Sequence, residues 1–445
     1  MNRIFYWIKR LSSLRNYTLG NFTVFVLVLF CIQYIPLESR AGVSMLKIGV
    51  SFLCLFFLLM RPPFMSKALM LLTAYFVVVF ALVSLHPQTF RWSTMLYLLS
   101  FIIVYLYVYD SVVCRGIIDQ NTFMKFIVGL IYAYTVVLMM QQALIIFGIR
   151  SFPLLNLTQF LDRGIGANSL SYEPSSAARI MAVLYLSLIR MLELKLNRAV
   201  TVSDLWQDYK WLTIGFLWTM LTMGSGTAMI CLVLLSFYFL NLRHIIMVIA
   251  LSITFIIGIQ YIEFKPIQRV KVSVTAMLTG DKKDVMEADG SAASRIVPIM
   301  NFFALDFMDK DTWLGRGIDY TNNKGGYAAR VNTAVIGGIN EYGMISFLIL
   351  LIFIYSCVIY KVLSLETLLF TILFGCTLVN IAYVWGAVMV FSLVRFFQTS
   401  ITNGPYNQSG NNSCHLHVQC GEIYRRNAFL RHGTDHARFS PADRQ

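Results

Sequence analysis

The chain contains little charge. Only 13% of its 445 residues are Asp, Glu, Lys or Arg, whereas 58% are hydrophobic, and soluble domains carry about 25% charged residues. This composition excludes a soluble fold and indicates that lipid surrounds most of the chain. Because every backbone N–H and C=O in a bilayer core needs a partner within the chain, only a helix bundle or a closed β-barrel remains.

The alternating ten-residue segments that are typical of barrel strands are also missing. The apolar segments are unbroken runs of Leu, Ile, Val, Phe and Met that are long enough for membrane-spanning helices. The sequence therefore predicts an all-α, polytopic transmembrane helix bundle of about twelve helices. They are expected near 21–36, 44–60, 67–85, 92–109, 122–148, 176–194, 209–223, 226–241, 244–261 and 342–360, with two more within 365–397.

Other features are absent as well. No small-residue cleavage site follows the first apolar run, so this run is interpreted as a helix and not as a cleaved signal peptide. None of the eight cysteines falls in the long connectors predicted to face outward, so no disulfide framework is expected. The chain also lacks an Asp/His metal cluster and a nucleotide-binding loop, so we predict no metal, no cofactor and no nucleic-acid partner.

From residue 398 onward the apolar runs stop. The tail, 398–445, contains no Lys but holds four of the six histidines and Cys414 and Cys420. The spacing of these residues matches no standard zinc pattern, and the composition favours a disordered tail without an assigned function. Four regions are thus expected: helices 1 to 9 within 1–262, a large loop at 263–340, further helices within 341–397, and the tail.

Positive charge is divided unevenly between the connectors. With the N-terminus placed inside, the inward connectors hold 14 Lys or Arg and the short outward connectors hold five. The positive-inside rule supports this orientation, which places the connector around 150–175 and the larger one at 263–340 on the extracytoplasmic side. Connectors of this length in a compact bundle are usually functional.

The large loop contains three arginines in suggestive contexts. Arg295 opens an amphipathic stretch, Ala292 to Met308, which is expected to lie on or dip into the membrane plane. Arg316 sits between two glycines that permit a tight turn, and Arg330 follows shortly before the next apolar run. Three guanidinium groups at one membrane face suit a pyrophosphate, although ordinary surface arginines remain an equal interpretation.

The smaller loop adds Arg163 and then Glu173 and Pro174 at the start of the sixth apolar run, with Arg179 shortly after. Pro174 fits the first turn of a helix. Glu173 is either a carboxylate stabilised by the helix dipole or a carboxylate held at the lipid boundary for acid–base chemistry. The residues alone leave both interpretations open.

Taken in order, these elements resemble the repeat-unit polymerases of O-antigen and capsule (Wzy-like), over about residues 120–360. The resemblance rests on short motifs and on their expected common side of the membrane. They are Glu173-Pro174-Ser175, Ser294-Arg295, Gly315-Arg316-Gly317, Asn332 and Glu341-Tyr342-Gly343.

The resemblance implies a metal-independent glycosyltransferase at the periplasmic face of the bacterial inner membrane. Its substrate would be an undecaprenyl-pyrophosphate-linked oligosaccharide, and its partners membrane lipids and, in addition, flippase and chain-length regulator proteins. Arg295 and Arg330, assisted by Arg316 or Arg163, would hold the pyrophosphate, and Glu173 would activate the acceptor hydroxyl. Supporting roles would fall to Arg179, Asn332 and Glu341.

Two departures from the family pattern keep alternatives open. Relatives often have a Ser-Arg pair where this chain has Ser225-Gly226, and the related O-antigen ligases carry a His where Val331 precedes Asn332. The first alternative is a ligase of the same architecture. The second is a non-enzymatic flippase for lipid-linked sugars, which would be expected to bury charge at mid-depth in its spans.

The predicted orientation has a direct test. Alkaline phosphatase fused within 263–340 should be active, and the same reporter fused within the connector at 197–201 should be inactive, because that enzyme folds only outside the cytoplasm. The reverse pattern would remove the basis for a site at the outer face.

Overall fold

The computed structural model of the chain describes residues 18–35, 44–61, 63–149, 152, 155–157, 166–239, 290–321, 323, 325–375 and 381–402. Within these ranges the chain is helical and forms no strand beyond an isolated bridge between Phe152 and Leu155. The predicted all-α class is confirmed. The predicted helix near 244–261, Arg163 and the tail beyond Thr402 lie outside the described residues, as does the side chain of Arg295.

Apolar helices dominate the described parts of the chain. A first helix, Thr18–Cys31, precedes the labelled elements. The longer α-helices are α2 (Met45–Met60), α3 (Lys67–Ser84), α4 (Trp92–Tyr109), α5 (Gln120–Ile146), α6 (Pro174–Leu196), α7 (Val202–Thr222), α8 (Gly226–Ser236), α12 (Gly290–Phe303), α15 (Ile339–Phe353), α16 (Leu365–Phe374) and α17 (Ala382–Thr402). Short elements are the π-helices Asp110–Cys114 and Ile354–Val358, the 3-10 turns Phe237–Phe239 and Ile336–Gly338, and the small helices α13 (Lys310–Leu314) and α14 (Tyr327–Thr333).

Five of the described helical segments are long and apolar enough to cross a membrane. They are Lys67–Ser84, Trp92–Cys114, Gln120–Ile146, Ile336–Val358 and Ala382–Ser400. These segments indicate a membrane protein. The count of twelve helices stays a prediction, because the described ranges stop at 239 and resume at 290.

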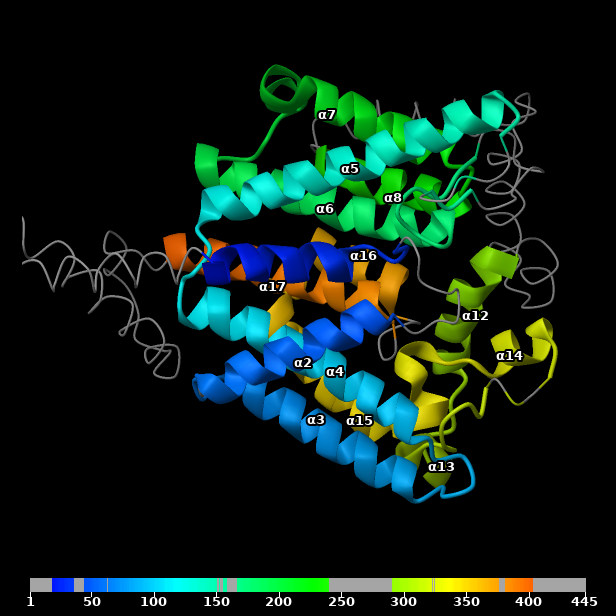
Figure 1. Ribbon diagram of the computed structural model, residues 1–445. Coiled ribbons are helices and arrows are strands. Elements are labelled where there is room, and N and C mark those ends of the chain that lie inside the picture. The colour runs from blue at the N-terminus through cyan, green and yellow to red at the C-terminus, as the bar shows by residue number, and fades with distance from the viewer. Residues whose placement is uncertain are drawn as a thin grey trace, which may run out of the picture.

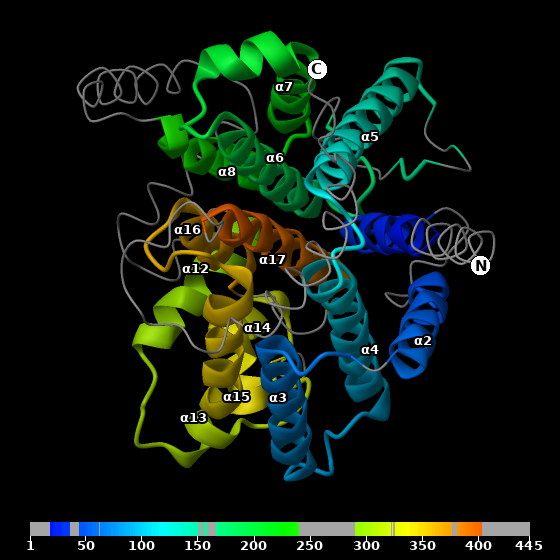
Figure 2. The ribbon, with the colours of Figure 1, turned by 90° about the vertical axis from the view of Figure 1, so that its left-hand side faces the viewer.

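The helices form two groups with α17 between them. In one group α5, α6, α7 and α8 pack together, and in the other α4 contacts α2 and α3 while α3 packs along α15. Seen along the helix axes, α17 runs through the middle and contacts both α6 and α4 (Figure 2). A single large hydrophobic core, containing residues such as Phe101, Ile189 and Trp385, joins the two groups.

Several helices begin at a polar residue whose side chain accepts a hydrogen bond from the first turn. Ser44, Ser66, Asp119 and Ser364 do this for α2, α3, α5 and α16. Since the first N–H groups of a helix have no partner within the helix, these caps fix where each apolar run becomes helical. The sequence placed several of these starts to within a few residues.

Several helix boundaries differ from the predicted ones. α7 begins at Val202 and not near 209, because Thr201 and Asp204 form a capping box ahead of the apolar run. α12 ends at Phe303, so the amphipathic stretch predicted to reach Met308 is shorter. The last apolar stretch divides into α16 and α17 as predicted, but α17 continues to Thr402, beyond the expected end near 397.

The described connectors gather at two opposite ends of the bundle (Figure 1). We call one the Arg179 end, because Arg179, in the second turn of α6, donates there to the carbonyl of Leu373 at the end of α16. The turn after α3 lies at this end too, since His86 bonds to the Gly315 carbonyl. α12, α13 and α14 lie on this side, at the right of Figure 1.

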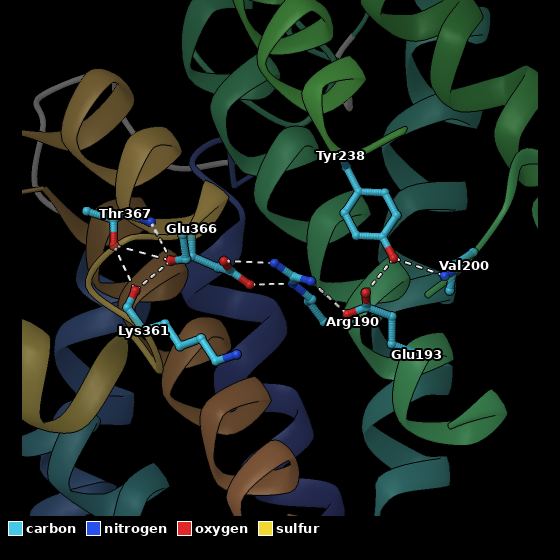
Figure 3. Close-up of polar contacts among 8 residues, drawn as sticks. Arg190, Glu193, Val200, Tyr238, Lys361, Glu366 and Thr367 are labelled. Atoms are coloured by element: carbon cyan, nitrogen blue, oxygen red, sulfur yellow. Dashed lines mark hydrogen bonds and ion pairs between the residues drawn. The ribbon is translucent and has the colours of Figure 1, made fainter. Parts of the chain in front are cut away.

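The opposite end is tied together by a cluster of charged side chains around Arg190 (Figure 3). Arg190 of α6 forms a two-pronged ion pair with Glu366 of α16 and donates to Glu193 at 2.7 Å. Tyr238, just after α8, donates to Glu193 and accepts from the Val200 amide at 3.0 Å. Three segments that are distant in sequence are thereby fixed relative to one another.

We predict that Glu366→Gln lowers the free energy of unfolding by about 3 kcal/mol, because it leaves a largely buried guanidinium without its main counter-charge. Unfolding in detergent mixtures of increasing sodium dodecyl sulfate content, followed by circular dichroism, measures this. Arg198→Gln is the matched control, since the Arg198–Asp204 pair lies at the surface and should matter little. Equal effects of the two changes would contradict the central role of the Arg190 cluster.

Candidate functional site

Glu173 precedes α6 directly as its N-cap residue. Its backbone is extended, its carboxylate is exposed and makes no capping bond to the helix, and it accepts a 3.2 Å hydrogen bond from the Ser175 hydroxyl. Pro174 occupies the first helical position as predicted. The carboxylate is therefore accessible at the Arg179 end and is placed at the positive end of a helix dipole.

Arg179 is buried in the same helix, with only 6% of its surface exposed. Its guanidinium donates to two carbonyl oxygens, those of Ser175 at 3.3 Å and Leu373 at 3.2 Å, and lies 5.1 Å from the centre of the Tyr383 ring. A guanidinium has five N–H donors, so two bonds leave most of them unused. Among the described residues, no carboxylate pairs with Arg179.

The start of α8 lies at the same end of the bundle, and α8 packs against α6 and α16. Its N-cap residue Ser225 is buried and makes no side-chain capping bond. The Thr227 side chain is 1% exposed, and its hydroxyl has no hydrogen-bond partner. Unused amide donors at a helix N-terminus and a buried, unpaired hydroxyl both favour an anion or another polar ligand nearby.

Arg316 lies in the turn after α13, where carboxylates already surround it. It pairs with Asp309 at 3.1 Å and with Asp311 at 3.3 Å, and donates to the Tyr320 hydroxyl at 2.8 Å. Partial burial alone would lower the pKa of Arg316, but the bonds to Tyr320 and Asp309 raise it above the ordinary value. Its charge is thus compensated within the chain, which makes it a poor candidate for holding a pyrophosphate.

The two glycines around Arg316 serve packing. The amide of Arg316 donates to the Asn340 carbonyl at 2.9 Å and that of Gly317 to the Glu341 carbonyl at 3.2 Å. Gly315 and Gly343 lie so close together that a Cβ on either residue would overlap backbone atoms of the other segment. The Gly315-Arg316-Gly317 and Glu341-Tyr342-Gly343 motifs are therefore two halves of one contact, and these amides are not open to a ligand.

Arg330 and Asn332 lie on α14, and both side chains are exposed. Asn301 of α12 holds this segment by donating to the carbonyls of Asn332 and Ala334, each at 2.8 Å. Arg330 makes no side-chain hydrogen bond or ion pair to another described residue. Of the arginines predicted from the large loop, it is the one whose described side chain is uncompensated.

A short series of backbone contacts links α14 to Arg179. α14 is followed by the 3-10 turn that contains Gly337, whose amide donates to the Gly375 carbonyl at 2.6 Å. Gly375 follows α16, whose Leu373 carbonyl accepts from Arg179. The structure thus brings Glu173, Arg179 and the segment with Arg330 to one end of the bundle, together with Glu341.

Sequence reasoning missed Asn301 and took Thr227 for part of an ordinary turn between two helices. Both are ordinary polar residues near apolar runs, and nothing in their spacing distinguishes them from capping or surface residues. It also undervalued Arg179, which it placed at the start of the sixth predicted helix, because burial cannot be read from such a position. Asp309 and Asp311 were not singled out in the sequence, although they compensate Arg316.

Comparison with protein-family models, curated proteins and solved structures finds no match to this chain.

We predict that Gly343→Ala destabilises the contact between the Gly315 and Gly343 turns. Gly343 has φ 80° and ψ 158°, a conformation that is essentially restricted to glycine and costs other residues about 1 to 3 kcal/mol. The same unfolding titration measures the loss. Gly326→Ala, where a Cβ would meet nothing within 4 Å, should leave stability nearly unchanged, and a similar loss there would contradict the assignment.

Proposed function

We propose that the chain is a membrane-embedded glycosyltransferase that polymerises lipid-linked oligosaccharide repeat units into O-antigen, capsule or exopolysaccharide. The site would lie at the Arg179 end, facing the periplasm of the bacterial inner membrane. The resemblance of the ordered motifs supports this function, and the gathering of Glu173, Arg179 and Arg330 at one end of an apolar bundle is compatible with it.

In the proposed reaction, a sugar hydroxyl of the incoming lipid-linked unit attacks the anomeric carbon of the growing glycan. A new glycosidic C–O bond forms, and the bond between that carbon and the carrier pyrophosphate breaks. The electron pair leaves with the pyrophosphate, whose growing charge the arginines would stabilise. The hydroxyl proton passes to a carboxylate, for which Glu173 is the accessible candidate.

The observation that carries the proposal is the environment of Arg179. Burying a cation without a counter-ion costs on the order of several kcal/mol, and its two carbonyl partners and one aromatic ring compensate only part of this. Arg179 is the most buried of the described arginines. The less buried Arg190 has two carboxylates, whereas Arg395, which is also less buried, donates to the carbonyls of Tyr355 and Ile359.

The roles proposed here for the arginines differ in part from those predicted from the sequence. Arg179 moves from a supporting position to the main phosphate ligand, because it is buried and uncompensated. Arg330 keeps its role as an exposed second ligand, and Arg295 stays a candidate by sequence alone. Arg316 is reassigned to holding its own turn, because Asp309 and Asp311 neutralise it.

A transporter function is less well supported than a polymerase function. The buried charged residues Lys47, Asp110, Arg179 and Glu366 lie within about two turns of the ends of their helices and not at mid-depth. Lys47, for example, donates to the Ile32 carbonyl just after the first helix at 2.6 Å. A path for a polar glycan through the bundle would be expected to carry such groups along its length.

The experiment is deletion of the gene in its host, followed by separation of the lipid-linked and surface glycans by size. Polymerase activity predicts that only single repeat units remain and that the wild-type gene restores the ladder. Arg179→Gln should lower polymer formation by about a hundredfold, as expected for loss of a main contact to the leaving group. Arg316→Gln is the matched control and should restore most of the ladder.

Other outcomes would point elsewhere. Long lipid-linked chains that fail to reach their acceptor would indicate a ligase, and repeat units retained at the cytoplasmic face would indicate a transporter. A full ladder with Arg179→Gln, at wild-type amounts of protein, would exclude the assigned site. Arg179→Lys separates charge from geometry, because lysine keeps the charge but loses the planar, two-pronged contact.

A further inference from the structure

The segment 303–313, from the last residue of α12 through most of α13, carries large apolar side chains that the described chain leaves largely or partly exposed. Phe303 is 81% exposed and Met308 94% exposed, and Phe307 and Trp313 are partly exposed beside them. We call this segment the elbow. We propose that the elbow inserts these side chains among the acyl chains of the adjoining bilayer leaflet and so anchors the large loop to the membrane surface.

The elbow lies at the level where a bilayer would end. The Gly315 carbonyl, two residues beyond Trp313, bonds to His86 at 3.0 Å, and Arg91 pairs with Asp319 at 2.6 Å. His86 follows α3, whose 18 residues span about 27 Å, close to the thickness of about 30 Å of a hydrocarbon core. These bonds therefore hold the elbow near the boundary between acyl chains and headgroups.

The elbow also lies beside two of the helical segments that are long and apolar enough to cross a membrane. α13 packs against α15, which packs against α3 (Figure 2). The outward sides of these two spans expose Val77, Leu85 and Ile352. Trp92 is exposed at the same end of the bundle, and tryptophans are typical of the membrane boundary.

Polar groups near acyl chains need hydrogen-bond partners within the protein, and several polar groups of the elbow find them within the segment. The Met308 amide donates to the Asp306 carboxylate at 2.9 Å, and the Thr312 hydroxyl donates to the Asp306 carbonyl at 2.8 Å. The indole N–H of Trp313 donates to the Phe307 carbonyl at 2.9 Å. The Trp313 ring can therefore face acyl chains without an unpaired donor.

The charge of the elbow indicates that its insertion does not depend on anionic lipids. Asp306, Asp309 and Asp311 stand between the apolar residues, and Lys310 and the paired Arg316 offset only part of this charge. Electrostatic attraction to anionic headgroups is therefore not the driving force. Burial of apolar surface is, so a zwitterionic bilayer should suffice.

The test measures the depth of a nitroxide label at position 308 in the full-length protein, reconstituted in phosphatidylcholine nanodiscs. Five of the eight cysteines are buried and stay in place, and Cys376, Cys414 and Cys420 are changed to Ser. Met308→Cys carries the label. Benchmarks are Ile352→Cys, exposed on a span, and Gln207→Cys, exposed at the polar start of α7.

The proposal predicts that collisions of the label at 308 with oxygen exceed those with a water-soluble nickel chelate, as at position 352 and several-fold more than at 207. Adding phosphatidylglycerol should leave this ratio unchanged. A ratio like that at 207 would show the elbow in water and overturn the proposal. Protection from both reagents would show a protein surface covering it, which would overturn the proposal equally, whatever the chain's reaction.

Discussion

A bilayer core offers no hydrogen-bond partners and no water, so every polar group in it must be satisfied by the chain itself. This constraint explains why the described chain is helical and why its charges gather at two ends. It also explains why several buried charged groups near the ends have specific partners. Asp110, for instance, accepts from the Phe64 amide and pairs with Arg115 just after the π-helical turn.

The two ends of the bundle meet this constraint in different ways. α6 and α16 run between them, and at one end the Arg190 cluster joins these helices by a two-pronged ion pair. At the other end they are joined by the single 3.2 Å bond from Arg179 to the Leu373 carbonyl. One end is thus closed by compensated charge. At the other end some N–H donors of the Arg179 guanidinium are unused, as the proposed site for an anionic lipid-linked substrate would need.

Much of the fold could be predicted from the sequence, because helices that cross a bilayer require long apolar runs and such runs can be read directly from the sequence. Long apolar runs placed most described helices to within a few residues, and the structure shows that caps such as Ser66 and Asp119 fix where some of them begin. Glu173 before Pro174 was located correctly at the start of α6. The early start of α7 was missed because the capping box of Thr201 and Asp204 acts ahead of the apolar run.

The candidate site was less predictable, because it depends on which distant residues meet. Arg316 looked like a phosphate ligand in the sequence, and only the folded chain brings Asp309 and Asp311 against it. Arg179 looked like an ordinary residue at the start of a helix, and only packing against α16 and Tyr383 buries it without a carboxylate. Pairing and burial are tertiary properties, and one sequence carries no direct sign of either.

Whether Arg179 binds the pyrophosphate of a lipid-linked substrate can be measured by calorimetric titration of the purified protein in nanodiscs with a short-chain polyprenyl pyrophosphate. We predict saturable binding to the wild type that weakens at least about tenfold in Arg179→Gln, the loss expected for one charge-assisted contact, and that is retained in Arg316→Gln. Equal binding by the wild type and Arg179→Gln, or loss only with Arg316→Gln, would contradict this prediction.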